Sequence, residues 1–210
     1  MRDTWAIVPV KPLREGKSRL STILEEDQRW ALNRWLLEHT LQVLNESDLF
    51  EHILLISRDG EALAVGRKYA ARTIQEEGLP KLNGAVERAT RYAQQTRAES
   101  VLIIPTDLPL LDQDTLKDMS SKTHHQPYVI IAPDRHQKGT NALWLSPPGK
   151  FAYHFGVDSF QAHLAEASQN GNDVAVFQHP NIALDIDDAE DLRYLVSLNK
   201  SIPILEIIPH

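Results

Sequence analysis

The chain contains no cysteine, which excludes disulfide bonds, thiolate metal ligands and cysteine nucleophiles. It has no long run of lysine and arginine, and its formal net charge of −7 argues against a nucleic-acid partner. It also lacks a run of about 18 apolar residues and an N-terminal signal pattern. We therefore expect a cytoplasmic protein that does not bind a membrane.

What is present is an ordinary globular composition: 210 residues, 42% hydrophobic and 24% charged, long enough for a full core. We find no internal repeat and no linker, so we expect a single domain over residues 1–210. Apolar runs typical of buried strands alternate with amphipathic helical patterns through the first half. This alternation predicts an α/β fold, with a twisted, mostly parallel sheet covered by helices on both faces.

The second half is richer in strands, and we expect it to contribute a small antiparallel addition to the sheet. The expected strands are 4–10, 52–57, 71–75, 101–105, 128–132, 142–145, 173–177 and 182–186. The expected long helices are 27–46, 82–97, 112–122 and 187–199. The tail at 202–210 is apolar with two prolines; as an extended arm it could swap onto a neighbouring copy and make a homodimer.

The stretch at 101–111, VLIIPTDLPLL, places Asp107 just past a buried strand. In an open α/β sheet this position lies at the rim where ligands bind. A carboxylate there suits Mg²⁺, which is usually held by one or two carboxylates and by phosphate oxygens. The alternative is that Asp107 caps or solvates a loop.

The loop after the first strand, at 11–20, is crowded with cations: Lys11, Arg14, Lys17 and Arg19. Such a loop can hold a triphosphate with side chains and backbone N–H groups. It could also be a solvated surface loop.

Asp185 and Asp187, in the sequence LDIDD, are a second source of carboxylates. If they end a strand, alternation places both on one face, where they could meet Asp107 around a metal ion. The alternative is that they cap the last helix, a role that fits Asp187 or Asp188 better than Asp185.

Two further stretches carry polar groups that could bind ligand. Asn83 stands at a helix start, where it could cap the helix or read a purine edge. Thr140 in KGTN, with Gly156 and Ser159 in FGVDS, could bind a carboxylate or phosphate through hydroxyl and backbone N–H groups. These residues could equally be ordinary turn and cap residues.

Cations, a metal site and positioned phosphates suffice for nucleotidyl transfer. An ionised phosphate can attack without a general base, so catalysis needs alignment and charge neutralisation. No serine–histidine–aspartate triad or nucleophile elbow points to a different chemistry.

Together these stretches resemble the CofC-type guanylyltransferases of coenzyme F-420 biosynthesis. The matching segments are IVPVKPLREGKSRL, LNGAVERA, LIIPTDLPLL, APDRHQKGTNALWL, FGVDSFQAHLAEA and ALDIDDAEDL, in the expected order. GTNAL followed by FGxxSFxxH is the most specific part.

The resemblance implies a three-layer nucleotidyltransferase fold and transfer of GMP from GTP to phosphoenolpyruvate or 2-phospho-L-lactate, with Mg²⁺. It assigns acid binding to Thr140, Gly156 and Ser159, the metal to Asp107 and Asp185, and the phosphates to the basic loop. Within that loop, Lys17 and Arg19 are the expected catalytic cations together with Asp107, and Lys11 is expected to bind nucleotide. Asn83 lies near the expected guanine position.

Two other interpretations stay open at this point. One is a related transferase of the molybdenum-cofactor or sugar-nucleotide kind, although those usually carry a glycine-rich loop where this chain has KPL. The other is a non-catalytic nucleotide-binding module.

Overall fold

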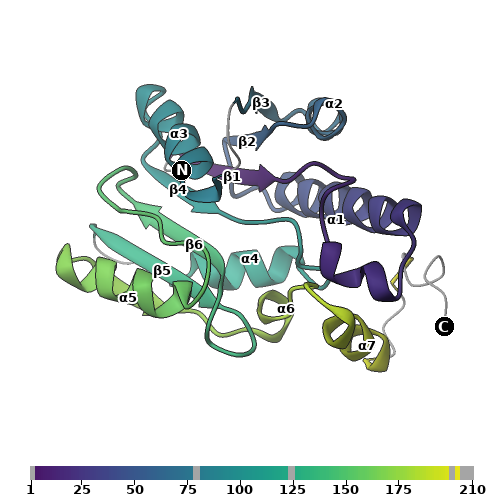
Figure 1. Ribbon diagram of the computed structural model, residues 1–210. Coiled ribbons are helices and arrows are strands. Elements are labelled where there is room, and N and C mark those ends of the chain that lie inside the picture. The colour runs from purple at the N-terminus through teal and green to yellow at the C-terminus, as the bar shows by residue number, and fades with distance from the viewer. Residues whose placement is uncertain (1–2, 78–80, 123–125, 199–201, 204–210) are drawn as a thin grey trace.

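A seven-stranded sheet forms the centre of the computed structural model, which describes residues 3–77, 81–122, 126–198 and 202–203 (Figure 1). The strand order is β3-β2-β1-β4-β6-β5-β7, and β6 alone runs antiparallel to its neighbours among the described strands. The strands are β1 (Thr4–Val10), β2 (His52–Ser57), β3 (Arg72–Gln75), β4 (Ser100–Ile103), β5 (Tyr128–Pro133), β6 (Thr140–Ser146) and β7 (Asp173–Val176).

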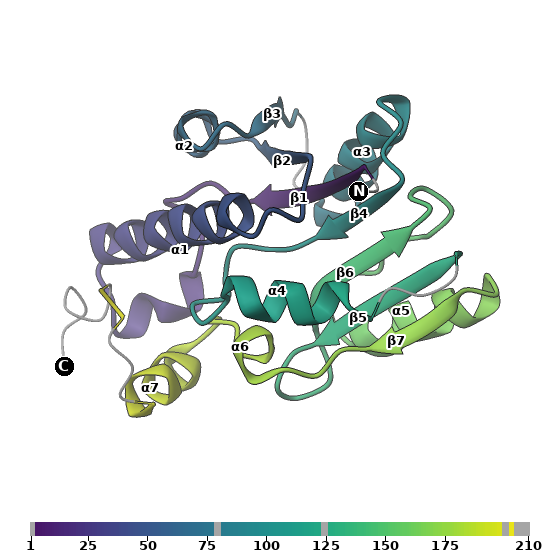
Figure 2. The ribbon, with the colours of Figure 1, turned by 180° about the vertical axis from the view of Figure 1, so that it is seen from behind.

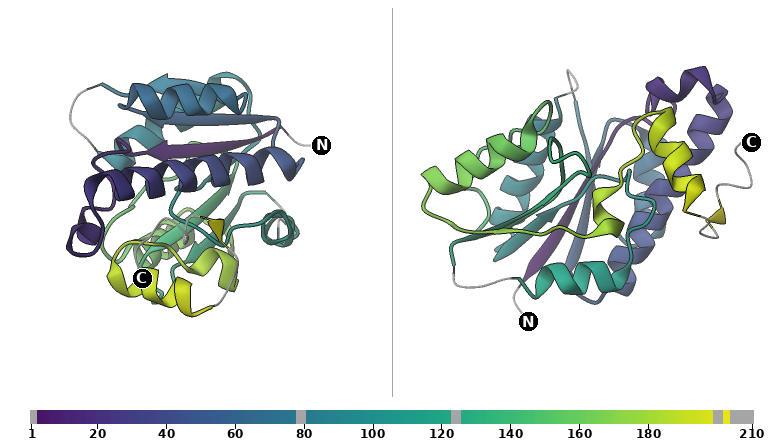
Figure 3. Two further views of the ribbon diagram at one scale, coloured as in Figure 1. Left: turned by 90° about the vertical axis from the view of Figure 1, so that its right-hand side faces the viewer. Right: turned by 90° about the horizontal axis from the view of Figure 1, so that it is seen from below.

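Helices cover both faces of this sheet. The face with α3 and α5 is towards the viewer in Figure 1, and the face with α1 and α4 is seen in Figure 2. Figure 3 shows the sheet between the two layers. The helices are η1 (Ser18–Thr22), α1 (Glu26–Glu46), α2 (Gly60–Lys68), α3 (Leu82–Gln95), α4 (Gln113–Ser120), α5 (Ser159–Gln169), α6 (Pro180–Ala183) and α7 (Ala189–Ser197).

Alternation along the strands explains why the sheet has a core on each side. Ala6 and Val8 of β1 pack with α1 and α2, whereas Trp5 and Ile7 pack with α3. Because strand side chains alternate with period two, an almost continuously apolar strand such as β1 supplies both cores. The expected α/β fold, with a mostly parallel sheet and an antiparallel addition, is confirmed.

A third, smaller core joins distant parts of the chain at one end of the molecule. Leu20 of η1 and Leu36 of α1 pack against Ile186 and Leu192, next to the carboxyl end of β1. This cluster holds the segment before α7 against the basic loop. It therefore positions Asp187, which follows Ile186, close to that loop.

One expected strand is wrong. Residues 182–186 were expected to be extended in the sheet, but α6 ends at Ala183 and the next four residues pair with none of the described strands. Pro180 occupies the first turn of α6 and His179 caps it, so the chain enters a short helix here. The backbone of Ile186 still donates to the carbonyl of Asp107 at 2.9 Å, which brings the two acidic segments together.

A β-bulge marks the start of β6. Pro133 pairs with Thr140 and Ala132 pairs with Ala142, which leaves Asn141 as an extra residue in the ladder. In a regular strand Asn141 would share a face with Leu143, towards α5. The bulge turns it instead towards α6, where its amide donates to the carbonyl of Ile182 at 3.0 Å.

Within the described residues, no helix combines the length and apolar character that a bilayer crossing requires.

Candidate active site

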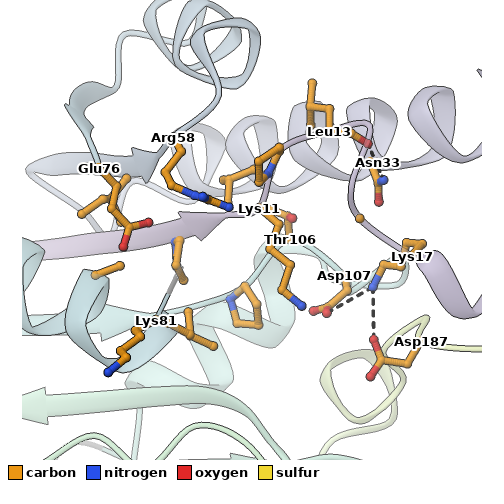
Figure 4. Close-up of a pocket in the computed structure, with 18 residues that line it drawn as sticks. Lys11, Leu13, Lys17, Asn33, Arg58, Glu76, Lys81, Thr106, Asp107 and Asp187 are labelled. Atoms are coloured by element: carbon orange, nitrogen blue, oxygen red, sulfur yellow. Dashed lines mark hydrogen bonds and ion pairs between the residues drawn. The ribbon is translucent and has the colours of Figure 1, made fainter. Parts of the chain in front are cut away.

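Lys17 meets two acidic segments at the carboxyl end of the sheet. Its Nζ lies 3.3 Å from Asp107 Oδ2 and 3.4 Å from Asp187 Oδ1 (Figure 4). Only 10% of its side chain is exposed. Burial opposes the charged ammonium, but the two carboxylates outweigh it and raise the pKa of Lys17. The structure thus places a fixed positive charge beside Asp107.

The loop that carries Lys17 is held by backbone contacts of Leu13. The Leu13 N–H donates to Asp59 Oδ2 at 2.8 Å, and its carbonyl accepts from Asn33 Nδ2 at 2.7 Å. Asn33 also lies under Gly16, where an added Cβ would stand 2.6 Å from Asn33 Nδ2. The chain then passes through a left-handed conformation at Lys17, with φ 57°. Anchoring and close packing therefore set the position of the ammonium group.

The other cations of the loop are distributed differently. Lys11 is exposed and lines the same cavity as Lys17. Arg19 lies 3.9 Å from Asp187 with 75% of its side chain exposed. Arg14 turns away to pair with Glu26, at 3.3 Å, on α1. Lys11, Lys17 and Arg19 therefore lie near the cavity or the acidic segments, and Arg14 does not.

Asp107, Asp185 and Asp187 form one cluster of carboxylates. One oxygen from each lies within 4.8 Å of the others, the spacing expected of ligands that share a single ion. Asp107 Oδ1 is buried with no hydrogen-bond partner within the described structure. Burial, with the charges of Asp107 and Asp187, raises the pKa of Asp185 to about 7. Such a cluster suits a hard cation.

The prediction that Asp187 or Asp188 caps the last helix is confirmed, and Asp188 is the residue that does so. The Asp188 side chain accepts from the N–H groups of Glu190 and Asp191 at the start of α7. Asp187 instead directs its carboxylate towards Lys17. All three aspartates at 107, 185 and 187 are therefore available to a metal ion.

A cavity of about 250 Å³ opens beside this cluster (Figure 4). Lys17, Asp107 and Asp187 line one end, and Arg58, Glu76 and Lys81 line the other. Apolar residues also line it, namely Pro9, Val10, Pro12, Leu13, Ile56, Leu82, Ala85 and Pro105. An elongated cavity with polar ends and apolar walls can accept a molecule with a charged end and a flat ring.

Thr140 lies in a buried hydrogen-bond network on the α5 side of the sheet. The backbone N–H of His154 donates to His163 Nε2 at 2.9 Å, so His163 carries its proton on Nδ1 and donates to Thr140 Oγ1 at 2.9 Å. Ser159 Oγ donates to the same oxygen at 3.3 Å. The Thr140 hydroxyl accepts these two bonds and has no acceptor among the described residues, so its own proton can be donated to a ligand.

The imidazole that orients Thr140 is uncharged. Burial, with the neighbouring His154, lowers the pKa of His163 to about 4. His163 therefore stays neutral, with its proton on Nδ1, at neutral pH.

Gly156 and Ser159 approach Thr140 from the start of α5. Gly156 has φ 141°, a conformation that favours glycine, and no atom lies within 4 Å of a Cβ added there. The backbone N–H of Phe160 donates to the carbonyl of Lys138 at 2.9 Å, joining this turn to the loop before β6. The structure thus brings together the three residues expected to bind an acid.

Asn83 is not the cap of α3, because Lys81 occupies that position. Its amide makes two bonds to the backbone of Phe155, donating to the carbonyl at 3.1 Å and accepting from the N–H at 2.8 Å. Both polar atoms of Asn83 thus hold the turn before Gly156. Its expected contact with a base stays a prediction.

Sequence reasoning missed several polar residues around the site. Asn33 lies on the apolar stripe of α1, where nothing in the pattern marks it. Arg58 and Glu76 directly follow β2 and β3, and their positions at parallel strand ends could have indicated them. Asn141 reaches Asp185 at 3.3 Å only because of the bulge.

Comparison with solved structures places the fold among nucleotidyltransferases. A nucleotidyl transferase from Methanothermobacter thermautotrophicus aligns with a TM-score of 0.63 and 13% identity, covering 99% of this chain and 100% of that one. A cytidylyltransferase from Leptospira borgpetersenii aligns with a TM-score of 0.61 and 11% identity, covering 99% and 94%. The expected nucleotidyltransferase fold is confirmed.

Sequence comparison gives a finer result. A phosphoenolpyruvate guanylyltransferase from Rubrobacter xylanophilus is 37% identical over 92% of this chain and 93% of its own length. A 2-phospho-L-lactate guanylyltransferase from Methanothermobacter thermautotrophicus is 33% identical over 92% and 84%. The family model described as guanylyl transferase CofC like matches residues 4–199. The resemblance inferred from the motifs is thus confirmed, and the chain belongs to the CofC-like guanylyl transferase family.

Proposed function

We propose that this protein transfers GMP from GTP to the phosphate of phosphoenolpyruvate or 2-phospho-L-lactate. The observation that carries the proposal is the meeting of Lys17 with Asp107 and Asp187 at the end of the cavity. The names of the relatives support the choice of nucleotide and acceptor. We place the reaction in coenzyme F-420 biosynthesis.

The reaction needs alignment rather than proton transfer. An oxygen of the acid's ionised phosphate attacks the α-phosphorus of GTP, and the bond from that phosphorus to the bridging oxygen breaks to release pyrophosphate. Negative charge increases on the leaving pyrophosphate as this bond breaks. Lys17, fixed between two carboxylates and the loop anchors, supplies positive charge at that end of the cavity.

Asp107, Asp185 and Asp187 would hold Mg²⁺. Their oxygens fit a hard cation. A positive ion would supply a partner for Asp107 Oδ1, which has none within the described structure, and would offset the burial and the repulsion that raise the pKa of Asp185. When bound, Mg²⁺ would neutralise and orient phosphate oxygens. Asn141 supports the set by donating to Asp185.

Thr140, Ser159 and the backbone at Gly156 would bind the acid. The free Thr140 proton suits an oxygen of a carboxylate or phosphate. Asn141, next in the chain, contacts the carboxylate cluster, so the acid would bind next to the metal. Lys11, Lys17 and Arg19 would contact the triphosphate.

Two parts of the proposal lie beyond the site. We place the protein in the cytoplasm, where GTP is available. The homodimer stays a prediction, because the proposed swapping tail falls outside the described residues from 204 onward.

The test is to incubate the purified protein with GTP, Mg²⁺ and each acid separately, and to follow pyrophosphate. We expect pyrophosphate release that requires one of the two acids, and a product with the mass of GMP joined to the phosphate of that acid through a diphosphate bond. Release with neither acid, or equal release without acid, would contradict the proposal. CTP and ATP in place of GTP serve as matched nucleotide controls.

A further inference from the structure

The end of the cavity opposite Lys17 carries a carboxylate of its own. Glu76 follows the last residue of β3 and is half-buried. Its backbone N–H donates to the carbonyl of Ser57 at 2.9 Å, fixing it to the end of β2. In Figure 4 the Glu76 side chain lies with Arg58 and Lys81 at the end away from Asp107. The cavity therefore has two polar ends of different composition.

Glu76 has no side-chain hydrogen bond or ion pair within the residues that the structure describes. Arg58, which follows the last residue of the neighbouring strand β2, instead contacts Glu15 at 3.5 Å. A half-buried carboxylate that lines a cavity gains from donors brought by a ligand, because it can only accept hydrogen bonds. Arg58 and Lys81 line the same end, so their positive charges offset the charge of Glu76 and this end does not repel a nucleotide.

The walls of the cavity suit a planar ring. Ile56, Ala85 and Pro105 line it, and Leu82 at the start of α3 leaves 41% of its surface exposed there. An exposed leucine at a cavity wall gains burial when a ring covers it. With the phosphates at the Lys17 end, the ring of a nucleotide would lie towards Glu76.

We propose that Glu76 is the base-reading residue of the site and accepts hydrogen bonds from N1–H and the 2-amino group of guanine. The proposal rests on the proposed function, which places a nucleotide triphosphate in this cavity. Guanine presents two adjacent donors on this edge, a match for the two oxygens of a carboxylate. Adenine presents an acceptor at N1, which a carboxylate repels, so Glu76 both favours guanine and rejects adenine.

The test compares GTP with nucleotides that differ only on this edge. ITP lacks the 2-amino group, and XTP carries an oxygen in its place. Glu76→Gln offers one acceptor and one donor, which complement N1–H and the 2-oxygen of xanthine. We expect this variant to lower kcat/KM for GTP about tenfold or more, mainly through KM, and to raise the ratio of XTP to GTP use by more than about tenfold.

Glu77→Gln is the matched control, because Glu77 is the next residue, is exposed and does not line the cavity. This variant should leave kcat/KM for GTP, ITP and XTP unchanged. Glu76→Ala is a second variant: it should lose the preference for GTP over ITP without gaining XTP. A gain with XTP cannot come from damaged folding, since unfolding lowers activity with every nucleotide.

An unchanged ranking of GTP, ITP and XTP in both Glu76 variants would overturn the proposal, as would an equal loss with all three. Calorimetry of the same nucleotides, with Mg²⁺ and without acid, measures binding without the transfer reaction. It therefore distinguishes failure of the base-reading role from failure of the proposed function. If the wild-type protein forms no product, yet binds GTP more tightly than ITP and XTP and loses this preference in the Glu76 variants, the base-reading role stands and the transfer reaction fails. If GTP, ITP and XTP bind the wild-type protein equally, the base-reading role fails.

Discussion

Lys17 Nζ lies 3.3 Å from Asp107 Oδ2, although 90 residues separate the two in the chain. The contact joins the loop after β1 to the loop after β4, and these are adjacent parallel strands. Strand order therefore brings together a cation and an acid that the sequence keeps apart.

Asp107→Asn should lower kcat by more than about 100-fold, because the substitution removes a charge from the proposed metal cluster and from its contact with Lys17. The fold should persist, since the side chain lies at a rim. Pyrophosphate release and thermal unfolding measure the two effects. Asp118→Asn, on the exposed side of α4, is the control and should keep full activity. Activity of Asp107→Asn near wild type would remove Asp107 from the metal site.

Thr140→Val should raise KM for the acid about tenfold or more and change KM for GTP less. Valine has nearly the same shape but cannot donate the free proton, and it leaves the Nδ1–H of His163 without an acceptor. Thr140→Ser keeps the hydroxyl and should recover most of the acid affinity. An equal rise in both KM values would place this loop elsewhere in the reaction.

Gly16→Ala should lower activity, because the new Cβ would collide with Asn33, whose amide is held by the Leu13 carbonyl. Relieving the collision moves either the loop or the anchor and should cost about 1–3 kcal/mol of stability. Chemical denaturation and kcat/KM for GTP check the result. Gly60→Ala is the control, because nothing lies within 4 Å of a Cβ there. Unchanged kinetics of Gly16→Ala would show that the loop tolerates displacement.

His163 should make folding stability depend on pH. Its pKa falls from 6.5 to about 4 on folding, so between these values the unfolded chain binds a proton that the folded protein does not. Stability should therefore fall as pH decreases from about 6.5 towards 4, by on the order of 3 kcal/mol, and be unaffected by this group above 6.5. Denaturation curves of wild type and His163→Gln measure the difference. Equal slopes in the two proteins would contradict the assignment.

Much of the fold could be predicted because buried parallel strands leave a plain signal. The expected bounds of β1 and β2 agree with the structure at both ends, since continuous apolar runs end there in charged loops. The expected strand at 182–186 failed for a physical reason: its alternation fits a strand, but none of the described strands pairs with it. Alternation reports which side of a segment is buried, and that side here packs on η1 and α7 rather than within a sheet.

Some residues of the site could be predicted from the sequence, and others could not. Lys17 and Asp107 follow apolar strands, so their meeting could be expected from topology alone. Asn33 and His163 act through other residues, and nothing in their local sequence shows a partner 20 or more positions away. The position of Asn141 depends on a ladder irregularity, which no pattern of residue types reveals.

The bulge at the start of β6 fixes the distance between the proposed acid site and the carboxylate cluster, and this affects how specificity for the acid could change. Thr140 and Asn141 are consecutive, so their Cα atoms are about 3.8 Å apart, yet they face opposite sides of the sheet. The span between the acceptor and the carboxylate cluster is thereby set by one peptide unit and not by any mobile segment. Substitutions around α5 can reshape the space for a different acid while this span stays constant, so a new acceptor would still meet the nucleotide at the same separation.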